Sequence, residues 1–295
     1  IAIIFLVLET SYDKKIRLNL YCGENQYDWD CNIMKQIVLA IVLATFFISP
    51  DTSRADNFSL GGMAINRPLY EGSDESEIDL LPIIDISIGK WAFVNNERGL
   101  GFYVLKEREL ELGGAIGYYE SRNEKDSAKL QGFDDISDGF DGRMFAKYNM
   151  GRTSLSFQIR SDLSDNHKGT LFDIGAAYSI NPNRRINWTL KAATTFADKN
   201  YMQTYFGVSQ TQANQTIFSS TPTAFVPRGG WKDISVNSKF SIDFTRRWNA
   251  KWVMGYKRLT RDAAYSPLVR GVGSDNQFYF GVGLAYKFSD RIFRF

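Results

Sequence analysis

The sequence is poor in the residues that build metal centres and covalent frameworks. Its 295 residues include one histidine and two cysteines, which leave little for a zinc site or a disulfide framework. A charge excess of one sign is also missing, because the formal net charge is +2, so no polyanion-binding footprint is present. No apolar run reaches the roughly 18 residues that a spanning helix needs. With 23% charged residues, the composition also excludes a helical membrane bundle.

Glycine and aromatic residues are plentiful. The chain contains 24 glycines and 15% aromatic residues, with only 7 prolines. Together with the missing apolar runs, this composition favours a β-rich protein.

The first 55 residues read as a targeting region. Met34-Lys35-Gln36 forms a short basic segment, Ile37–Ile48 an apolar core of signal-peptide length, and Ser53-Arg54-Ala55 a small-residue cleavage signal. We therefore expect a signal peptide over 34–55, cleaved before Asp56. A membrane anchor is the weaker alternative, because the apolar core is too short to span.

The domain organisation follows from this interpretation. We expect residues 1–33 to be a mis-called upstream segment and residues 56–295 to form the working domain. Cys22 and Cys31 both fall in the upstream segment, so the exported chain has no cysteine and cannot depend on disulfides.

From Asp56 onward, strict alternation of apolar and polar residues recurs without a helical period. Phe278, Phe280, Val282, Leu284 and Tyr286 alternate with polar or small residues, and similar dyads recur upstream. Such dyads give each strand one face in an apolar medium and one in a polar medium.

Three observations distinguish a membrane barrel from a soluble sandwich. Aromatic residues stand near both ends of the apolar faces, as Trp248 and Tyr256 do, in the manner of interfacial girdles. The opposite faces carry full charges, which a dry core would reject and a wet lumen accepts. The chain also ends on Phe295, after Phe288, and a terminal phenylalanine resembles the signal that the barrel assembly machinery recognises.

The spacing of the alternating segments predicts an all-β fold, a transmembrane antiparallel up-and-down β-barrel of about 12 strands, with ten as the alternative. The expected strands are 57–67, 80–87, 90–95, 99–105, 110–120, 139–148, 153–160, 170–180, 186–197, 230–244, 248–258 and 276–288. Short connectors alternate with long ones along most of the chain, as tight periplasmic turns and long external loops do in bacterial barrels.

Several motifs resemble those of the MipA/OmpV family of outer-membrane proteins. They are Tyr70-Glu71-Gly72-Ser73-Asp74, Arg98-Gly99-Leu100-Gly101, Leu130-Gln131-Gly132-Phe133, Tyr201–Ser209, Ser266-Pro267-Leu268-Val269, Gly273–Gln277 and Tyr286-Lys287-Phe288. Their order and spacing cover essentially all of 56–288. The tail Ser289–Phe295 runs past the family's usual end, so either Phe288 or Phe295 could be the assembly signal.

The resemblance implies location in the Gram-negative outer membrane, in contact with lipid and lipopolysaccharide. It also implies a scaffold that links a murein transglycosylase to a penicillin-binding protein. Because function varies across the family, a surface adhesin and a narrow channel for small solutes remain open.

The longest connector, Asp198–Gly229, contains the family signature. We expect its residues Tyr201, Met202, Gln203, Thr204, Tyr205 and Phe206 to form the binding segment. A loop of this length is uncommon unless it is functional or folded inward. It could bind a partner, constrict the lumen, or simply close the barrel mouth.

Other polar residues carry weaker signals. His167 lies near Ser161, Asp162, Ser164 and Asp165, yet neighbours along a loop are not a catalytic triad, and we expect no enzyme and no cofactor. Seven acids fall in or beside external loops and favour a solvated rim over a calcium site, since no ordered ligand spacing is present: Asp74, Glu75, Glu77, Asp134, Asp135, Asp138 and Asp141.

The polar strand faces predict a charged lumen. We expect Arg143, Lys191, Lys239, Asp243, Lys251 and Lys287 to face it, together with Lys147, Arg160, Lys257, Asp141, Asp173 and Asp233. An open lumen of this composition would weakly favour anions. Opposed charges could instead pair across it and fill it, which is the interpretation that we favour.

Overall fold

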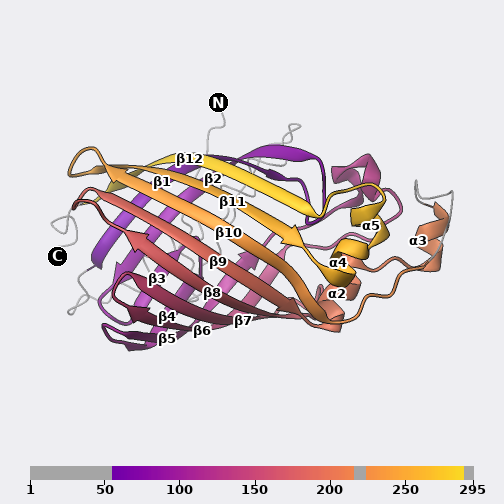
Figure 1. Cartoon of the computed structure of the whole chain (residues 1–295), viewed down its shortest axis with the longest axis horizontal. Coiled ribbons are helices and arrows are strands. Elements are labelled where there is room, and N and C mark those ends of the chain that lie inside the picture. Colours follow the sequence, from indigo (N-terminus) through magenta and orange to yellow (C-terminus); the bar gives the residue numbers. More distant parts are fainter. Residues whose placement is uncertain (1–54, 216–223, 289–295) are drawn as a thin grey trace, which may run out of the picture. The chain divides into compact units, whose positions relative to one another are not determined.

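The computed structural model describes residues 55–215 and 224–288. The predicted upstream segment, nearly all of the predicted signal peptide and the tail from Ser289 to Phe295 lie outside these described residues. The described chain forms a closed barrel in which each strand pairs antiparallel with its neighbours, and β1 closes the wall against β12 (Figure 1). The predicted barrel fold and the strand number of twelve are confirmed.

The strands run in chain order around the barrel. Their bounds are β1 Ala55–Pro68, β2 Ser76–Ile88, β3 Ala92–Asn95, β4 Gly99–Lys106, β5 Leu110–Tyr119, β6 Gly139–Met150, β7 Thr153–Asp162, β8 Thr170–Ile180, β9 Ile186–Ala197, β10 Gly230–Asp243, β11 Trp248–Leu259 and β12 Asn276–Lys287. The prediction placed the start of β2 four residues too late. Glu77 and Asp79 alternate with Ile78 and Leu80 there, so the strand pattern already begins before residue 80.

The alternation arises because the two faces of the wall meet different media. Large apolar side chains such as Met254, Phe280 and Leu284 are more than half exposed on the outer face. Aromatic pairs lie near both ends of this face, with Trp248 against Tyr286 at a centroid distance of 5.1 Å and Tyr256 against Phe278 at 4.8 Å. An apolar outer band between aromatic girdles is the surface of a membrane barrel.

The connectors divide into two kinds, and we name the barrel ends after them. The turn end holds the connectors 89–91, 107–109, 151–152, 181–185 and 244–247, and the loop end holds 69–75, 120–138, 163–169, 198–229 and 260–275. The helices of the described residues all lie at the loop end (Figure 1).

These helices are short, which explains why the sequence shows no helical period. They are η1 Glu124–Asp126, η2 Ala128–Leu130, α2 Lys199–Phe206, α3 Gln210–Gln215, α4 Arg261–Tyr265 and α5 Pro267–Arg270. None exceeds about two turns, so no repeat at helical spacing can build up. No helix in the described part of the chain is long and apolar enough to cross a membrane.

The β3–β4 hairpin is shorter than the rest of the wall. β3 pairs with β2 only over Asp85–Ile88, and the side chain of Asn96 extends the ladder by binding the backbone of Pro82 and Ile84 at 2.7 Å. Proline offers no N–H to a neighbouring strand, which suits a position at the edge of paired structure. The turn that carries Glu97 therefore lies partway up the wall.

The end of β12 is tied to the start of β1. The backbone N–H of Phe288 donates to the carbonyl of Phe58 at 2.8 Å, and the two rings lie 4.6 Å apart. Phe288 is thus part of the closing seam of the barrel. Phe295, the other candidate for the assembly signal, lies outside the described residues.

Candidate functional site

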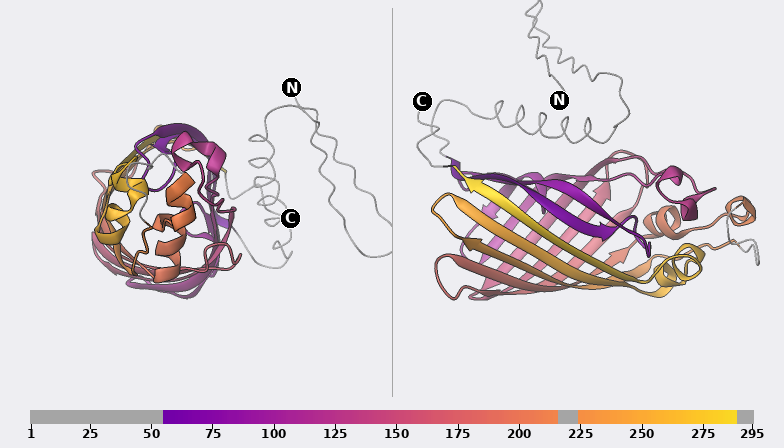
Figure 2. Two further views of the ribbon diagram at one scale, coloured as in Figure 1. Left: turned by 90° about the vertical axis from the view of Figure 1, so that its right-hand side faces the viewer. Right: turned by 90° about the horizontal axis from the view of Figure 1, so that it is seen from above.

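Helix α2 lies across the opening at the loop end, as the end-on view in Figure 2 shows. Asp198 caps its first turn by accepting a hydrogen bond from the backbone N–H of Tyr201 at 2.9 Å. Two positions of the signature segment, Met202 and Phe206, are 1% and 0% exposed. They pack against Leu259 and α4 beneath them, so α2 is a buried lid element rather than a free loop.

A second apolar cluster joins further connectors to this lid. Tyr70, Leu130, Phe133, Val208 and Leu268 are buried together, and they come from four different connectors. The Ser266 hydroxyl also donates to the carbonyl of Phe206 at 2.7 Å and links the two clusters. We call this assembly of connectors 69–75, 120–138, 198–215 and 260–275 the cap.

Arg122 anchors the C-terminal end of α2 to the cap. Its guanidinium donates to the carbonyl of Tyr205 at 2.8 Å and to that of Thr204 at 3.4 Å. A cation at this position satisfies carbonyls that the helix leaves unpaired. Burial lowers the pKa of Arg122 from its ordinary value, although an arginine remains charged.

A polar network fixes the underside of the cap to the wall. Glu71 accepts hydrogen bonds from Lys232 and, at 3.2 Å, from Lys257, while the hydroxyl of Tyr201 donates to it at 3.0 Å. Lys232 is 3% exposed and also contacts Asp233 at 2.9 Å. Burial acts to raise the pKa of Glu71, but the two lysines outweigh it and hold that pKa well below its usual range.

His167 lies in an aromatic cage at the edge of the cap. Its ring is 4.9 Å from that of Tyr119, 5.3 Å from Tyr201 and 5.7 Å from Tyr205. Nδ1 accepts a hydrogen bond from the backbone N–H of Gly169 at 3.1 Å, and burial lowers the pKa of the ring. Asp162 binds the backbone N–H of His167 rather than the imidazole, so this acid does not orient the ring as a general base.

Gly169 explains how the 163–169 connector reaches α2. A Cβ at this position would lie 2.6 Å from the backbone nitrogen and the Cβ of Tyr201. Only glycine allows so close an approach without displacing the helix.

The inward strand faces carry the charged residues expected in the lumen. Arg143 pairs with Asp141, Arg160 with Asp173 at 2.7 Å, and Lys287 with Asp243 at 2.6 Å. Each pair joins residues on the same strand or on strands that lie near each other, so these pairs line the wall.

Glu97 makes the one described ion-pair set that bridges distant strands in mid-lumen. From the tip of the β3–β4 hairpin it contacts Lys239 at 2.8 Å and Lys191 at 3.6 Å, on β10 and β9. The side chains of Glu97 and Lys239 are 56% and 50% exposed, so the space around them is wet. Sequence reasoning missed Glu97 because it belongs to a turn and not to an alternating strand.

Lys251 differs from the other predicted lumen cations. It alternates with Trp252 on β11 and therefore faces inward, yet among the described residues no carboxylate forms an ion pair with it. The interior therefore retains cationic character beside β11.

Each of the seven acids predicted for a rim has a partner within the protein. Asp74 and Glu75 contact Lys129, Glu77 contacts Arg67 at 3.8 Å, and Asp141 pairs with Arg143. Asp134, Asp135 and Asp138 accept hydrogen bonds from Gln212, the backbone of Glu124 and Tyr118. Within the described ranges, no group of three or more candidate ligands is arranged to hold a metal ion.

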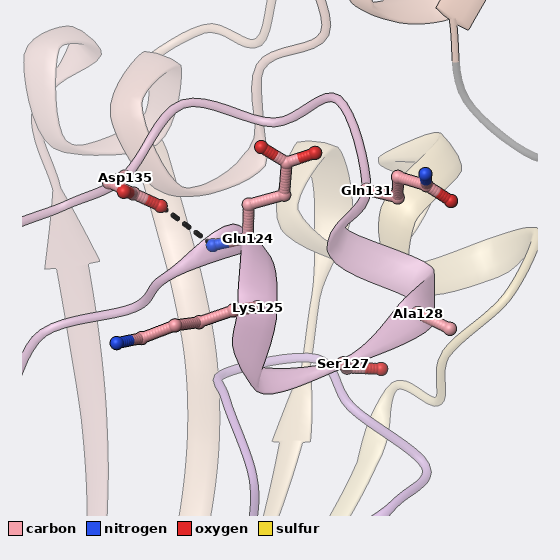
Figure 3. A pocket seen from close by; sticks show the side chains of 6 residues that line it. All are labelled: Glu124, Lys125, Ser127, Ala128, Gln131 and Asp135. Atoms are coloured by element: carbon pink, nitrogen blue, oxygen red, sulfur yellow. Dashed lines mark hydrogen bonds between the residues drawn. The ribbon is translucent and has the colours of Figure 1, made fainter.

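A shallow hollow of about 420 Å³ lies beside η1 and η2, and Figure 3 shows its lining. Asp135 accepts from the backbone N–H of Glu124 at 2.7 Å, and the carboxylate of Glu124 accepts from that of Gly132 at 2.8 Å. The side chains of Lys125 and Gln131 point in different directions (Figure 3). The hollow therefore offers no convergent ligand set.

The two ends of the barrel carry opposite charge. The loop-end connectors contain thirteen acidic and eight basic residues, whereas the turn-end connectors contain two acidic and seven basic residues. Arginine pairs, Arg184-Arg185 and Arg246-Arg247, stand in two neighbouring turns. The turn end is the more basic surface.

A closed antiparallel barrel with an apolar outer band, aromatic girdles and a charged interior is an outer-membrane β-barrel. The model of the family described as "MltA-interacting protein MipA" matches residues 60–288, and the chain belongs to this family. No curated protein matches the chain.

Among solved structures, the chain is similar to two membrane barrels at low identity. The NanC porin is 9% identical, with 79% of this chain and 100% of that chain covered and a TM-score of 0.39. OmpT of Vibrio cholerae is 9% identical, with 82% and 99% covered and a TM-score of 0.35.

Proposed function

We propose that this barrel acts by binding, as an outer-membrane scaffold for murein-remodelling enzymes, a transglycosylase and a penicillin-binding protein. The family description names an interaction with MltA, which supports a transglycosylase as one partner. In bacterial barrels the short turns face the periplasm, where murein and its enzymes lie. The turn end is therefore the surface that such partners would meet.

The observation that carries this proposal is the packed cap. Met202 and Phe206 are almost fully buried, and Glu71 ties α2 to lysines of the wall. A mouth filled in this way restricts passage, so the exposed surfaces rather than the lumen are left to act.

Capture from detergent-solubilised envelopes tests the scaffold. The mature barrel, residues 56–295 with an affinity tag, should retain both a murein transglycosylase and a penicillin-binding protein. An unrelated twelve-stranded barrel purified in the same detergent is the control for non-specific retention. If neither enzyme is enriched over this control, the scaffold proposal is wrong.

A narrow channel is the second candidate, and the wet surroundings of Glu97 and Lys239 favour it. Solute could cross only if the cap opened, because α2 covers the mouth. Single-channel recording separates the candidates, since a channel gives discrete conductance steps and a sealed barrel does not.

A further inference from the structure

A cavity of about 430 Å³ opens at the turn end. One wall is the β8–β9 turn, which contributes Arg184 and Arg185. The floor consists of inward-facing residues on β10, β11 and β12, namely Asp243, Asn249 and Lys287. The cavity thus joins exposed arginines to the polar bottom of the lumen.

The arginine wall is held in a fixed shape. Asn183 Oδ1 accepts hydrogen bonds from the backbone N–H groups of Arg185 at 2.9 Å and Ile186 at 3.1 Å. The carbonyl of Arg185 accepts from the backbone of Asp243 at 2.8 Å, which fastens the turn to β10. Asn side chains that bind the backbone in this way order a turn. The two guanidinium groups are therefore presented by a preformed segment.

The charges in the cavity do not cancel. Asp243 is already matched, because Lys287 Nζ contacts its two oxygens at 2.6 and 2.7 Å and Asn249 Nδ2 donates to it at 2.7 Å. Among residues 55–215 and 224–288, no carboxylate pairs with Arg184 or Arg185. The free positive charge of the site belongs to these two arginines.

One polar atom in the floor lacks a partner. Asn249 is 4% exposed, and its Oδ1 makes no hydrogen bond in the described structure. Since Nδ2 of the same amide donates to Asp243, the orientation of the amide is set and Oδ1 is left as an acceptor. A buried acceptor without a donor is costly. Oδ1 itself has almost no exposed surface, so a ligand N–H or O–H reaches it only with a small shift of the side chains that line the cavity.

We propose that this turn-end cavity binds a short peptide that carries a free carboxylate. The carboxylate would pair with Arg184 and Arg185, whose forked guanidinium groups suit it, and a peptide N–H would donate to Asn249 Oδ1. Murein stem peptides offer both groups beside the periplasmic face. The choice of murein stem peptides as the source of this peptide rests on the proposed function. The match between the cavity and a carboxylate does not depend on that function.

Calorimetric titration of the purified mature barrel tests this site. The probe is a soluble disaccharide tetrapeptide released from murein, compared with the same compound after amidation of its carboxyl groups. Wild-type protein should bind the acidic probe saturably, and Arg184→Gln/Arg185→Gln should weaken binding by at least about tenfold. Arg152→Gln removes a positive charge from another turn outside the cavity and should bind like wild type.

Asn249→Ala removes the acceptor in the floor, together with the amide donor to Asp243, and should weaken binding several-fold. Heat-modifiable mobility on gels shows whether each variant is a folded barrel. Inorganic phosphate serves as a competitor that distinguishes a peptide carboxylate from a phosphate source. No binding by the wild type, equal binding by the double arginine variant or by the amidated probe, or displacement by equimolar phosphate would overturn the proposal.

The same double arginine variant separates this inference from the scaffold. Retained enzyme capture with lost muropeptide binding would place the two activities on different surfaces. Lost capture with retained muropeptide binding would instead contradict the cavity as the peptide site. Failure of capture by wild type, with muropeptide binding intact, would remove the scaffold and leave the cavity.

Discussion

At the loop end, four connectors converge on two buried apolar clusters and a lysine-bound Glu71, and α2 fills the mouth. At the turn end, no connector exceeds five residues, and Arg184 and Arg185 form one wall of a cavity whose floor holds an unsatisfied acceptor. Buried apolar clusters belong to a surface that is closed. Exposed, unpaired positive charge beside a cavity belongs to a surface that is open to a ligand.

Removal of the central side chain of the cap should give the largest difference in stability between the loop end and the rest of the barrel. Phe206→Ala deletes a fully buried ring and should destabilise the packed cap by about 3–5 kcal/mol. Because the wall does not depend on this ring, the barrel itself should remain folded. Limited proteolysis should therefore cleave the 198–229 connector while heat-modifiable mobility stays unchanged. Gln203→Ala, on the exposed face of the same helix, is the matched control and should resist cleavage.

Loss of the buried carboxylate should open the cap next most readily. Glu71→Gln leaves Lys232 buried with Asp233 alone, and breaking such a buried pair costs on the order of 3 kcal/mol. Hydrogen exchange of the α2 amides should accelerate accordingly, while exchange in β6 and β7 stays unchanged. Replacing the three buried charges together, Glu71→Gln with Lys232→Met and Asp233→Asn, should recover part of the protection. Equal exchange in wild type and Glu71→Gln would show that the network does not fasten the cap.

Acid should weaken the cap in two stages. Burial lowers the pKa of His167 in the closed cap, so the opened cap binds more protons. The stability of the closed cap should therefore fall as the pH drops below about 6.5. The pKa of Glu71 is lowered too, which makes its contribution complete above about 4.5 and lost as the pH falls further. Exchange of the α2 amides, corrected for intrinsic rates, measures both stages. His167→Gln should abolish the first stage and keep the second.

The mid-lumen contact should have the smallest effect. Glu97→Gln removes the partner of Lys191 and Lys239, but these groups are between one-third and about one-half exposed, so stability should change by less than about 1 kcal/mol. In a Phe206→Ala background the same change should make the lumen more anion-selective. Reversal potentials in a salt gradient measure this. A shift toward cations would mean that Glu97 does not face the conducting path.

The wall could be predicted from sequence because its two faces meet different media. On β11, Trp252 faces lipid and its neighbour Lys251 faces the lumen, and on β12 Phe280 and Gly281 alternate in the same way. Each pair consists of adjacent residues, so the alternation is visible in the sequence alone. The short β3–β4 hairpin was also found, although its inward Glu97 was not.

The cap could be predicted only in part. The position of the signature segment Tyr201–Phe206 was visible, but an eight-residue helix is too short to show a periodic pattern, and Asp198 as its cap was the only local signal. The partners of Glu71 lie 161 and 186 residues away on other strands. No rule of sequence spacing predicts a contact between residues so far apart, because only closure of the barrel brings them together.

Single-channel recording of the wild-type barrel in planar bilayers tests the closed loop end most directly. Our expectation is that the wild type gives no discrete conductance steps and that Phe206→Ala, whose cap is open, gives clear steps. Discrete steps from the wild type, equal in size and frequency to those of the variant, would contradict it.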